Sequence, residues 1–233
     1  MIDPEKVKGF WRARARSGKD LPFESIGNLE QDPDNLKLKV QLETAKVFSW
    51  LPALEGRSIL DLGAGVGQWS FRFAERGARV VAVEYCEEMA RIGRLEAARR
   101  GMANRVVFLT SAAEDFESQE AFDIIFMSGL MVYMNDDQAE RLSTRLRPQC
   151  RPDGLLMLRD GTGLGRRHEI DNQFSEHLQA CYSATYRTRE QYLALFAAAG
   201  FRLVRDEDMF EEGCPLNKYR ETRLRLYLFK PEG

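Results

Sequence analysis

The residues that most clearly indicate a functional site are three glycines at alternate positions and an acidic residue that follows them along the chain. Gly63, Gly65 and Gly67 follow a short apolar run, and Glu84 ends a second apolar run. Closely spaced glycines let a ligand approach the backbone. A helix that begins after them points free amides and a positive dipole end at that ligand. A carboxylate at the end of the next strand can accept hydrogen bonds from a ribose. The pattern predicts a nucleoside site in a βαβ unit.

The residue after the third glycine restricts the kind of nucleotide cofactor that this site is expected to bind. A dinucleotide fingerprint of the form GxGxxG would need glycine at position 68, where the chain has Gln68. The pattern therefore disfavours an NAD-dependent dehydrogenase, while a nucleoside cofactor without a pyrophosphate stays compatible with it.

The elements that must position this site alternate along the chain. We expect strands at 58–60, 80–83, 105–109, 122–127 and 155–158, with helices at 70–76, 87–100 and 136–146 between them. Such alternation predicts a Rossmann-like, doubly wound α/β fold with a mostly parallel sheet and helices on both faces. A turn is expected at 147–154 and a flexible loop at 161–165. A helix at 188–199 and strands at 201–204 and 219–229 then predict a closing antiparallel hairpin at the sheet edge.

The N-terminal region precedes this alternation. Apolar and basic residues predict a helix that ends at Ser17-Gly18, and a second helix is expected to have Asp32 as its cap and Pro33 in its first turn. We expect residues 1–54 to form a helical cap or lid and residues 55–233 to form the cofactor-binding domain. Within that domain, 161–187 reads as an insertion that shapes the substrate pocket, and it includes His168 and His177.

Composition excludes several classes of protein. The chain has 233 residues, and 34 basic against 36 acidic side chains give a net charge of −2, which argues against a dedicated nucleic-acid binder. The sequence contains neither a signal peptide nor an apolar run of membrane-spanning length. Its four cysteines are scattered, and no His, Asp and Glu cluster has metal-ligand spacing. We therefore expect a cytoplasmic protein without a metal, a membrane or a nucleic-acid partner.

The chain resembles the class I S-adenosylmethionine-dependent methyltransferases. The segment 60–67 is similar to their first motif, and Glu84 matches their ribose-binding acid. The segments 112–116, 122–125 and 146–156 resemble their adenine loop, their fourth strand and the turn into their fifth strand. The resemblance covers about residues 55–230. It implies a seven-stranded sheet whose last strand is antiparallel, with S-adenosylmethionine as the cofactor.

The same resemblance implies which residues hold that cofactor. The glycine loop would hold the methionine moiety, Tyr85 would lie along the adenine, and Ala113 and Glu114 would face its ring. The full expected set is Asp61, Gly63, Ala64, Gly65, Gly67, Gln68, Glu84, Tyr85, Ala113, Glu114, Ser128 and Gly129.

Residues for the methyl acceptor are sought at the carboxyl ends of later strands, because ligands of open α/β sheets bind there. Asp160, Tyr133 and His168 are the candidates for catalysis, with a turn or cap as the alternative for Asp160 and a solvated loop residue for His168. The segment 182–188 is either a substrate wall or a packing edge with a helix cap. The expected substrate residues are Trp11, Tyr182, Tyr186 and Arg187.

The layout is also similar to the alpha-amino-terminal protein methyltransferases, through Phe10-Trp11 and Arg159-Asp160. Those enzymes carry Asn where this chain has Gly161 and His where it has Tyr133, so their substrate is not carried over. The leading hypothesis is methyl transfer to a nitrogen or oxygen of a small metabolite. The alternatives are a peptide or protein amino-terminal methyltransferase and a non-catalytic cofactor-binding protein. The sequence leaves the oligomeric state open.

Overall fold

A computed structural model describes residues 1–18, 21–176 and 178–233. His177, which the sequence placed in the insertion, lies outside these described residues. The described chain is built around a seven-stranded sheet with the order β3-β2-β1-β4-β5-β9-β8, and a two-stranded sheet of β6 and β7 lies apart from it.

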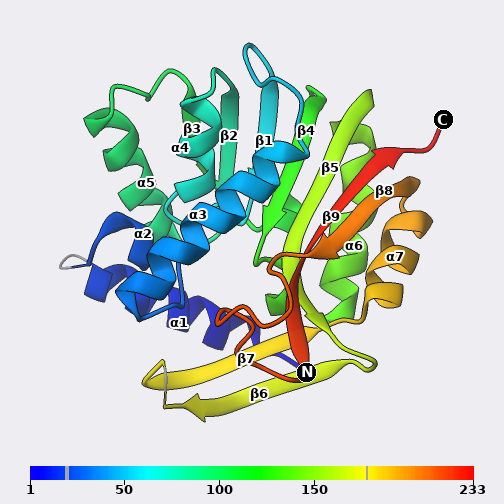
Figure 1. Cartoon of the computed structure of the whole chain (residues 1–233). Coiled ribbons are helices and arrows are strands. Elements are labelled where there is room, and N and C mark those ends of the chain that lie inside the picture. Colours follow the sequence, from blue (N-terminus) through cyan, green and yellow to red (C-terminus); the bar gives the residue numbers. More distant parts are fainter. Residues whose placement is uncertain (19–20, 177) are drawn as a thin grey trace.

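Figure 1 labels the elements along the chain. The helices are α1 Pro4–Ser17, α2 Phe23–Ile26, α3 Pro33–Ser49, α4 Gln68–Ala74, α5 Glu87–Arg99, α6 Asp136–Gln149 and α7 Arg189–Ala198, with 3-10 turns η2 Ala113–Asp115 and η3 Met131–Tyr133. The strands are β1 Ser58–Leu62, β2 Arg79–Glu84, β3 Val106–Thr110, β4 Phe122–Ser128, β5 Cys150–Gly163, β6 His168–Ser175, β7 Ala180–Tyr186, β8 Phe201–Asp208 and β9 Thr222–Pro231.

The main sheet confirms the predicted fold class. Strands β1 to β5 pair in parallel, while β9 pairs antiparallel with both β5 and β8. Neighbouring side chains of each strand point to opposite faces. Ile59 therefore joins the core under α3, α4 and α5, and Leu60 joins the core under α6 and α7. The helices cover both faces, as Figure 1 shows, and leave the carboxyl ends of the parallel strands available for a site.

Two local predictions are wrong. The turn expected at 147–154 is absent, because α6 continues to Gln149 with Pro148 inside its last turn, and β5 begins at Cys150. The Pro152-Asp153-Gly154 stretch forms an irregularity within β5, where the pairing with β4 shifts register between Phe122 and Ile124. The flexible loop expected at 161–165 is in part strand, since residues 161–163 pair with β9.

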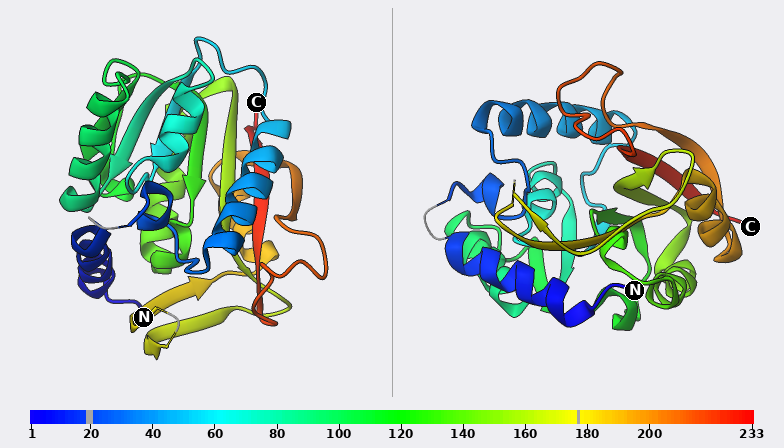
Figure 2. Two further views of the ribbon diagram at one scale, coloured as in Figure 1. Left: turned by 60° about the vertical axis from the view of Figure 1, so that its left-hand side comes forward. Right: turned by 90° about the horizontal axis from the view of Figure 1, so that it is seen from below.

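The insertion contains a β-hairpin that the sequence did not predict. Strands β6 and β7 pair antiparallel, with His168 opposite Tyr186. Most residues of β6 are exposed or half-buried, so the strand lacks the apolar run that marks a buried strand. The hairpin and α1 lie together below the carboxyl ends of the main sheet (Figures 1 and 2), and α1 contacts β7.

Two further features of the described chain bear on function. Among the described helices, none is both long and apolar enough to cross a membrane. In the same part of the chain, no three His, Cys, Asp or Glu side chains form a group that could hold a metal ion.

Candidate active site

A cavity of about 900 Å³ lies at the carboxyl ends of β1, β2, β4 and β5. It reaches from the glycine loop to the hairpin β6–β7, and α1, the loop after α2 and α3 contribute to its wall. This volume falls within the usual range of small-molecule sites, about 300 to 1,000 Å³. The cavity is therefore large enough for small ligands beneath a cover of N-terminal helices.

The glycine loop has the backbone that the sequence predicted. Gly63, Gly65 and Gly67 all have positive φ, at 71°, 59° and 88°. A Cβ on Gly65 would meet no described atom within 4 Å, whereas one on Gly67 would lie 2.4 Å from the ring of Phe108. Gly65 therefore presents open backbone to the cavity, while Gly67 allows α4 to pack closely against β3.

Two buried carboxylates face the cavity from neighbouring strands. Glu84 accepts hydrogen bonds from the Gly65 amide at 2.9 Å and from the Cys86 amide at 2.8 Å, so it fixes the loop as well as lining the site. Asp61 accepts a hydrogen bond from the Ser70 hydroxyl at 2.5 Å. Burial raises the pKa of Glu84, and burial also raises the pKa of Asp61 to about 7. Ligand hydroxyls could supply further donors to these groups.

The cavity beside Glu84 suits an aromatic ring system. Tyr85 lines it, and the hydroxyl of Tyr85 is buried without a hydrogen-bond partner among the described atoms. Ala113 and Glu114 of η2 line the same region. The Glu114 carboxylate accepts a hydrogen bond from Gln138 at 2.8 Å, which holds η2 against α6.

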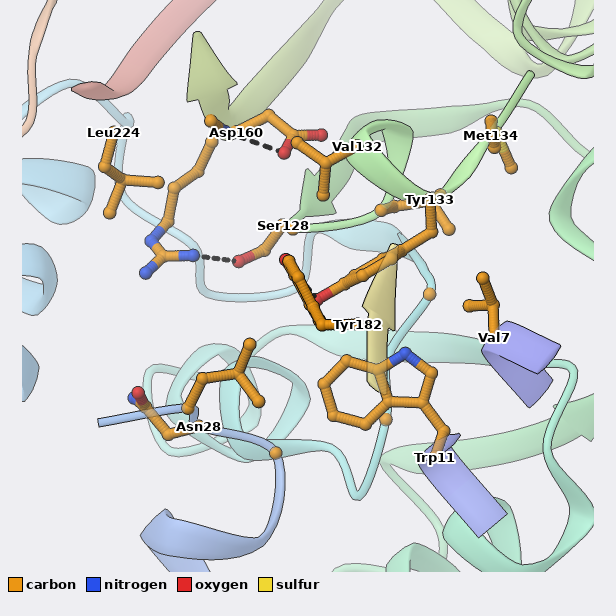
Figure 3. A pocket seen from close by; sticks show the side chains of 18 of the residues that line it. Val7, Trp11, Asn28, Ser128, Val132, Tyr133, Met134, Asp160, Tyr182 and Leu224 are labelled. Carbon is orange, nitrogen blue, oxygen red and sulfur yellow. Dashed lines mark hydrogen bonds between the residues drawn. The ribbon is translucent and has the colours of Figure 1, made fainter. Parts of the chain in front are cut away.

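The opposite end of the cavity carries three tyrosines. The hydroxyls of Tyr133 and Tyr182 lie 3.3 Å apart, and those of Tyr182 and Tyr186 lie 3.5 Å apart. Trp11 packs edge-on against Tyr133, and Figure 3 shows the Trp11 ring next to both Tyr133 and Tyr182. Burial raises the pKa of all three phenols, which are therefore neutral hydrogen-bonding groups at neutral pH.

Asp160 lies behind these tyrosines at the end of the parallel part of β5. Its two oxygens accept hydrogen bonds from the Met131 amide at 2.7 Å and from the Gly161 amide at 2.8 Å. It thereby anchors η3, the turn that carries Tyr133. Burial raises its pKa to about 6, so it is mostly ionised at neutral pH.

Gly161 also explains a departure from the amino-terminal methyltransferases. A Cβ at this position would lie 2.6 Å from ring atoms of Tyr186. The asparagine that those enzymes carry would collide with this ring, so the position of Tyr186 requires a glycine at position 161.

The N-terminal helices are tied down over the cavity. Arg14 of α1 donates hydrogen bonds to the carbonyls of Ile26 at 2.9 Å and Ser25 at 2.8 Å, which joins α1 to α2. Gln68, at the first position of α4, donates to the carbonyls of Phe23 at 3.1 Å and Glu24 at 2.6 Å. The side chain expected to contact the cofactor thus also fastens α2 to the glycine loop.

Most of the residues expected from the sequence come together in this one cavity. The residues that line it are Asp61, Gly63, Ala64, Gly65, Gln68, Glu84, Tyr85, Ala113, Glu114, Ser128, Gly129, Tyr133, Asp160, His168, Trp11, Tyr182 and Tyr186. Gly67 and Arg187 lie outside this lining. Arg187 is buried and donates to the carbonyls of Met131 and Met134, so it supports η3 from behind.

Sequence reasoning missed the polar wall formed by α3 and β5. Lys39 and Glu43 project from α3, and Arg159 from β5 forms an ion pair with Glu43 and donates to Ser128 at 2.8 Å. Glu43 and Arg159 are 116 residues apart in the chain. The only hint in the sequence was the row of charged residues on α3, a helix that the sequence assigned to the N-terminal cap.

Comparison with known proteins supports the reading of the fold. Residues 59–154 match the family described as "Methyltransferase domain". Phosphoethanolamine N-methyltransferase 1 of Triticum aestivum is 26% identical over 162 residues, which cover 68% of this chain and 31% of that protein. The tRNA U34 carboxymethyltransferase of Alteromonas mediterranea is 30% identical over 118 residues, covering 48% of this chain and 35% of that protein.

A solved structure matches over nearly the whole length. The 1,6-didemethyltoxoflavin-N1-methyltransferase of Burkholderia thailandensis, with bound 1,6-didemethyltoxoflavin and S-adenosylhomocysteine, has a TM-score of 0.68 and 19% identity. The match covers 100% of this chain and 92% of that one. The strand order, the glycine loop and the matched domain all indicate the same fold. Residues 59–154 thus match a methyltransferase domain, and the chain has the fold of the class I S-adenosylmethionine-dependent methyltransferase superfamily.

The site fits the cofactor of that superfamily on three observations. Open backbone at Gly65 would admit the cofactor, the buried carboxylate of Glu84 would face its ribose, and the unpartnered hydroxyl of Tyr85 lies where its adenine is expected. This chain spans only about a third of the length of each curated relative described above. The residues expected to hold the cofactor nevertheless line one cavity within this chain.

Proposed function

We propose that this chain is an S-adenosylmethionine-dependent methyltransferase that acts on a nitrogen or oxygen of a small molecule. The observation that supports this most strongly is a single cavity that joins the glycine loop to the tyrosine wall. In such an enzyme the bound cofactor supplies an electrophilic methyl group. The protein must bind an acceptor, orient it and exclude water.

Orientation would fall to the tyrosine hydroxyls. Tyr133, Tyr182 and Tyr186 form a connected series of neutral donors and acceptors. A heteroatom of the acceptor could replace one of these contacts and be held in a fixed direction. Asp160 keeps η3 in place through the Met131 amide, so it supports the position of Tyr133.

The character of this wall favours an amine acceptor. Methylation of a neutral amine produces a cation, and aromatic rings attract cations over their faces. Trp11 and the tyrosines provide those rings, and the Asp160 carboxylate adds negative charge behind them. Aromatic rings with a carboxylate behind them stabilise a developing ammonium better than a neutral ether product.

Water would be excluded by the N-terminal helices and the hairpin. Ile2 exchanges two backbone-to-side-chain hydrogen bonds of 2.8 Å with Asn135, which fixes the start of the chain near α6. Phe10 packs against Tyr182 at 6.0 Å between ring centroids. Together these contacts close α1 onto β7 over the tyrosine wall.

The proposal is tested by measuring S-adenosylhomocysteine formation with a panel of acceptors. The panel should contain small primary amines, small alcohols, phosphoethanolamine, and peptides with free and blocked amino termini. We expect turnover with a small amine above the acceptor-free background. Turnover confined to peptides with free amino termini would favour the amino-terminal methyltransferase. Cofactor binding without turnover on any acceptor would favour a non-catalytic binding protein.

A further inference from the structure

The wall of the cavity opposite the tyrosines carries an excess of positive charge. Lys39, Arg159 and Lys218 line it together with the carboxylates of Glu30 and Glu43. Glu43 is paired with Arg159, and Glu30 is paired with Lys218 at 2.6 Å. In Figure 3, Asn28 and Leu224 mark this side of the cavity, across from Tyr133.

Of these three cations, Lys39 is the one without a close ion pair, although Glu43 and Glu30 act on its charge from farther away. Its ammonium donates to the Asn28 side-chain oxygen at 2.9 Å. No carboxylate lies within 4.0 Å of it in residues 1–18, 21–176 and 178–233. Burial is the main cause of a lowered Lys39 pKa. An anion in the cavity would compensate this charge.

Two further donors in the same wall are unsatisfied. Arg159 is 8% exposed, and its Nε has no hydrogen-bond partner among the described atoms although both terminal nitrogens are engaged. The Thr44 hydroxyl, five residues along α3 from Lys39, is also buried without a described partner. Buried donors without partners are costly, and such groups need an explanation.

We propose that Lys39, Arg159 and Thr44 form a subsite for an oxyanion, either a carboxylate or a phosphate. Lysine and arginine hold such groups by charge-assisted hydrogen bonds, and a hydroxyl adds a neutral donor. This subsite rests on the proposed function, because it shares the cavity with the cofactor loop and the tyrosine wall.

The position of Arg159 places the subsite beyond the cofactor loop. Arg159 lies in β5, two strands from β1, which leads into the glycine loop. Neighbouring strands lie about 4.8 Å apart, so this separation is about 10 Å. The oxyanion is therefore either an acidic group of the acceptor or the carboxylate at the far end of the cofactor.

Calorimetry on the full chain separates these two sources. S-adenosylhomocysteine carries the carboxylate, and 5′-methylthioadenosine lacks it. Inorganic phosphate, titrated into the complex with S-adenosylhomocysteine, probes an acceptor site. The variants are Lys39→Met and Thr44→Val, with Lys37→Met as a matched control, because Lys37 is exposed on the same helix. Thermal unfolding checks that each variant is folded, and Thr44→Val carries the test if Lys39→Met is not.

If the cofactor carboxylate occupies the subsite, Lys39→Met weakens S-adenosylhomocysteine binding about 10- to 100-fold and leaves 5′-methylthioadenosine binding within about twofold. If the acceptor supplies the oxyanion, cofactor binding is unchanged and phosphate binding is lost by a similar factor. Thr44→Val gives a smaller loss in the same direction. The subsite is overturned if both variants bind all three probes as Lys37→Met does. Failure of the wild-type protein to bind either nucleoside would instead overturn the proposed cofactor.

Discussion

Replacing Gly65 by alanine should abolish cofactor binding while leaving the protein folded. Gly65 has φ = 59°, a left-handed conformation that alanine can adopt at a cost of about 1 to 2 kcal/mol. Its new Cβ would meet no described atom within 4 Å. The free energy of unfolding should therefore fall by about that amount and no more.

The methyl group would project into the space assigned to the cofactor. We expect the affinity for S-adenosylhomocysteine to fall at least about 100-fold, because a bound ligand close to the backbone leaves no room for a Cβ. Gly101→Ala is the matched control. Gly101 has φ = 67° and equally open surroundings, but it follows α5 away from the cavity. Gly67→Ala should instead damage the fold, since its Cβ would lie 2.4 Å from Phe108.

Urea denaturation and calorimetry measure the two quantities on the same samples. The expected result is a similar loss of stability in Gly65→Ala and Gly101→Ala, with cofactor binding lost in the first variant alone. Wild-type affinity in a folded Gly65→Ala protein would refute the placement of the cofactor against this loop.

Three further predictions concern the carboxylates and the tyrosine wall. Glu84→Gln presents an amide donor to the Gly65 or Cys86 amide, so calorimetry should show S-adenosylhomocysteine binding weakened about 10- to 100-fold; unchanged binding would remove Glu84 from the site. Tyr133→Phe loses the hydroxyl contact with Tyr182 and should lower kcat/KM for the acceptor about tenfold with cofactor affinity unchanged, and a normal kcat/KM would argue against that role. Asp61 has a pKa of about 7 in the folded chain against 3.8 ordinarily, so the folded state holds a proton that the unfolded state releases between these values. Its contribution to stability is present below about pH 4 and is lost as pH rises to 7. The stability of Asp61→Asn relative to wild type should therefore increase from about pH 4 to pH 7, by at most about 4 kcal/mol, and stay level above that; a pH-independent difference in urea denaturation would contradict this.

The cofactor half of the site was accessible to sequence reasoning because its determinants are local. The glycine loop needs positive φ at three positions, and only glycine adopts such angles without strain. Glu84 follows at the end of the next buried strand, and parallel strands bring their carboxyl ends to one edge of the sheet. Residue type and spacing alone therefore predict that Gly65 and Glu84 meet.

The acceptor half depends on contacts between segments distant in the sequence. Arg187 looked like a substrate residue because it adjoins Tyr186, yet its side chain turns inward to the carbonyls of η3. Lys39 gave no signal, because a charge on a helix usually faces solvent. Arg159 was noted only at the end of a strand, and its ion-pair partner Glu43 was not foreseen. Their burial results from α3 packing over β5, which periodicity cannot show.

Helix and strand ends were also harder to predict than the elements themselves. Pro148 was read as part of a turn at 147–154, but at the end of α6 it interrupts little of the helix. The Gln149 side chain donates to the Arg145 carbonyl at 3.1 Å and so helps to hold this last turn. The hairpin β6–β7 was missed because its sequence lacks the regular alternation of apolar and polar residues that marks a half-buried strand.

The central claim is that the glycine loop and Glu84 form a site for S-adenosylmethionine. Its most direct test is calorimetric titration of the full chain with S-adenosylhomocysteine, with NADH titrated in parallel. We predict one S-adenosylhomocysteine bound per chain, with competition by S-adenosylmethionine and no heat of binding from NADH. Binding of NADH, or the absence of S-adenosylhomocysteine binding at millimolar concentration, would contradict it.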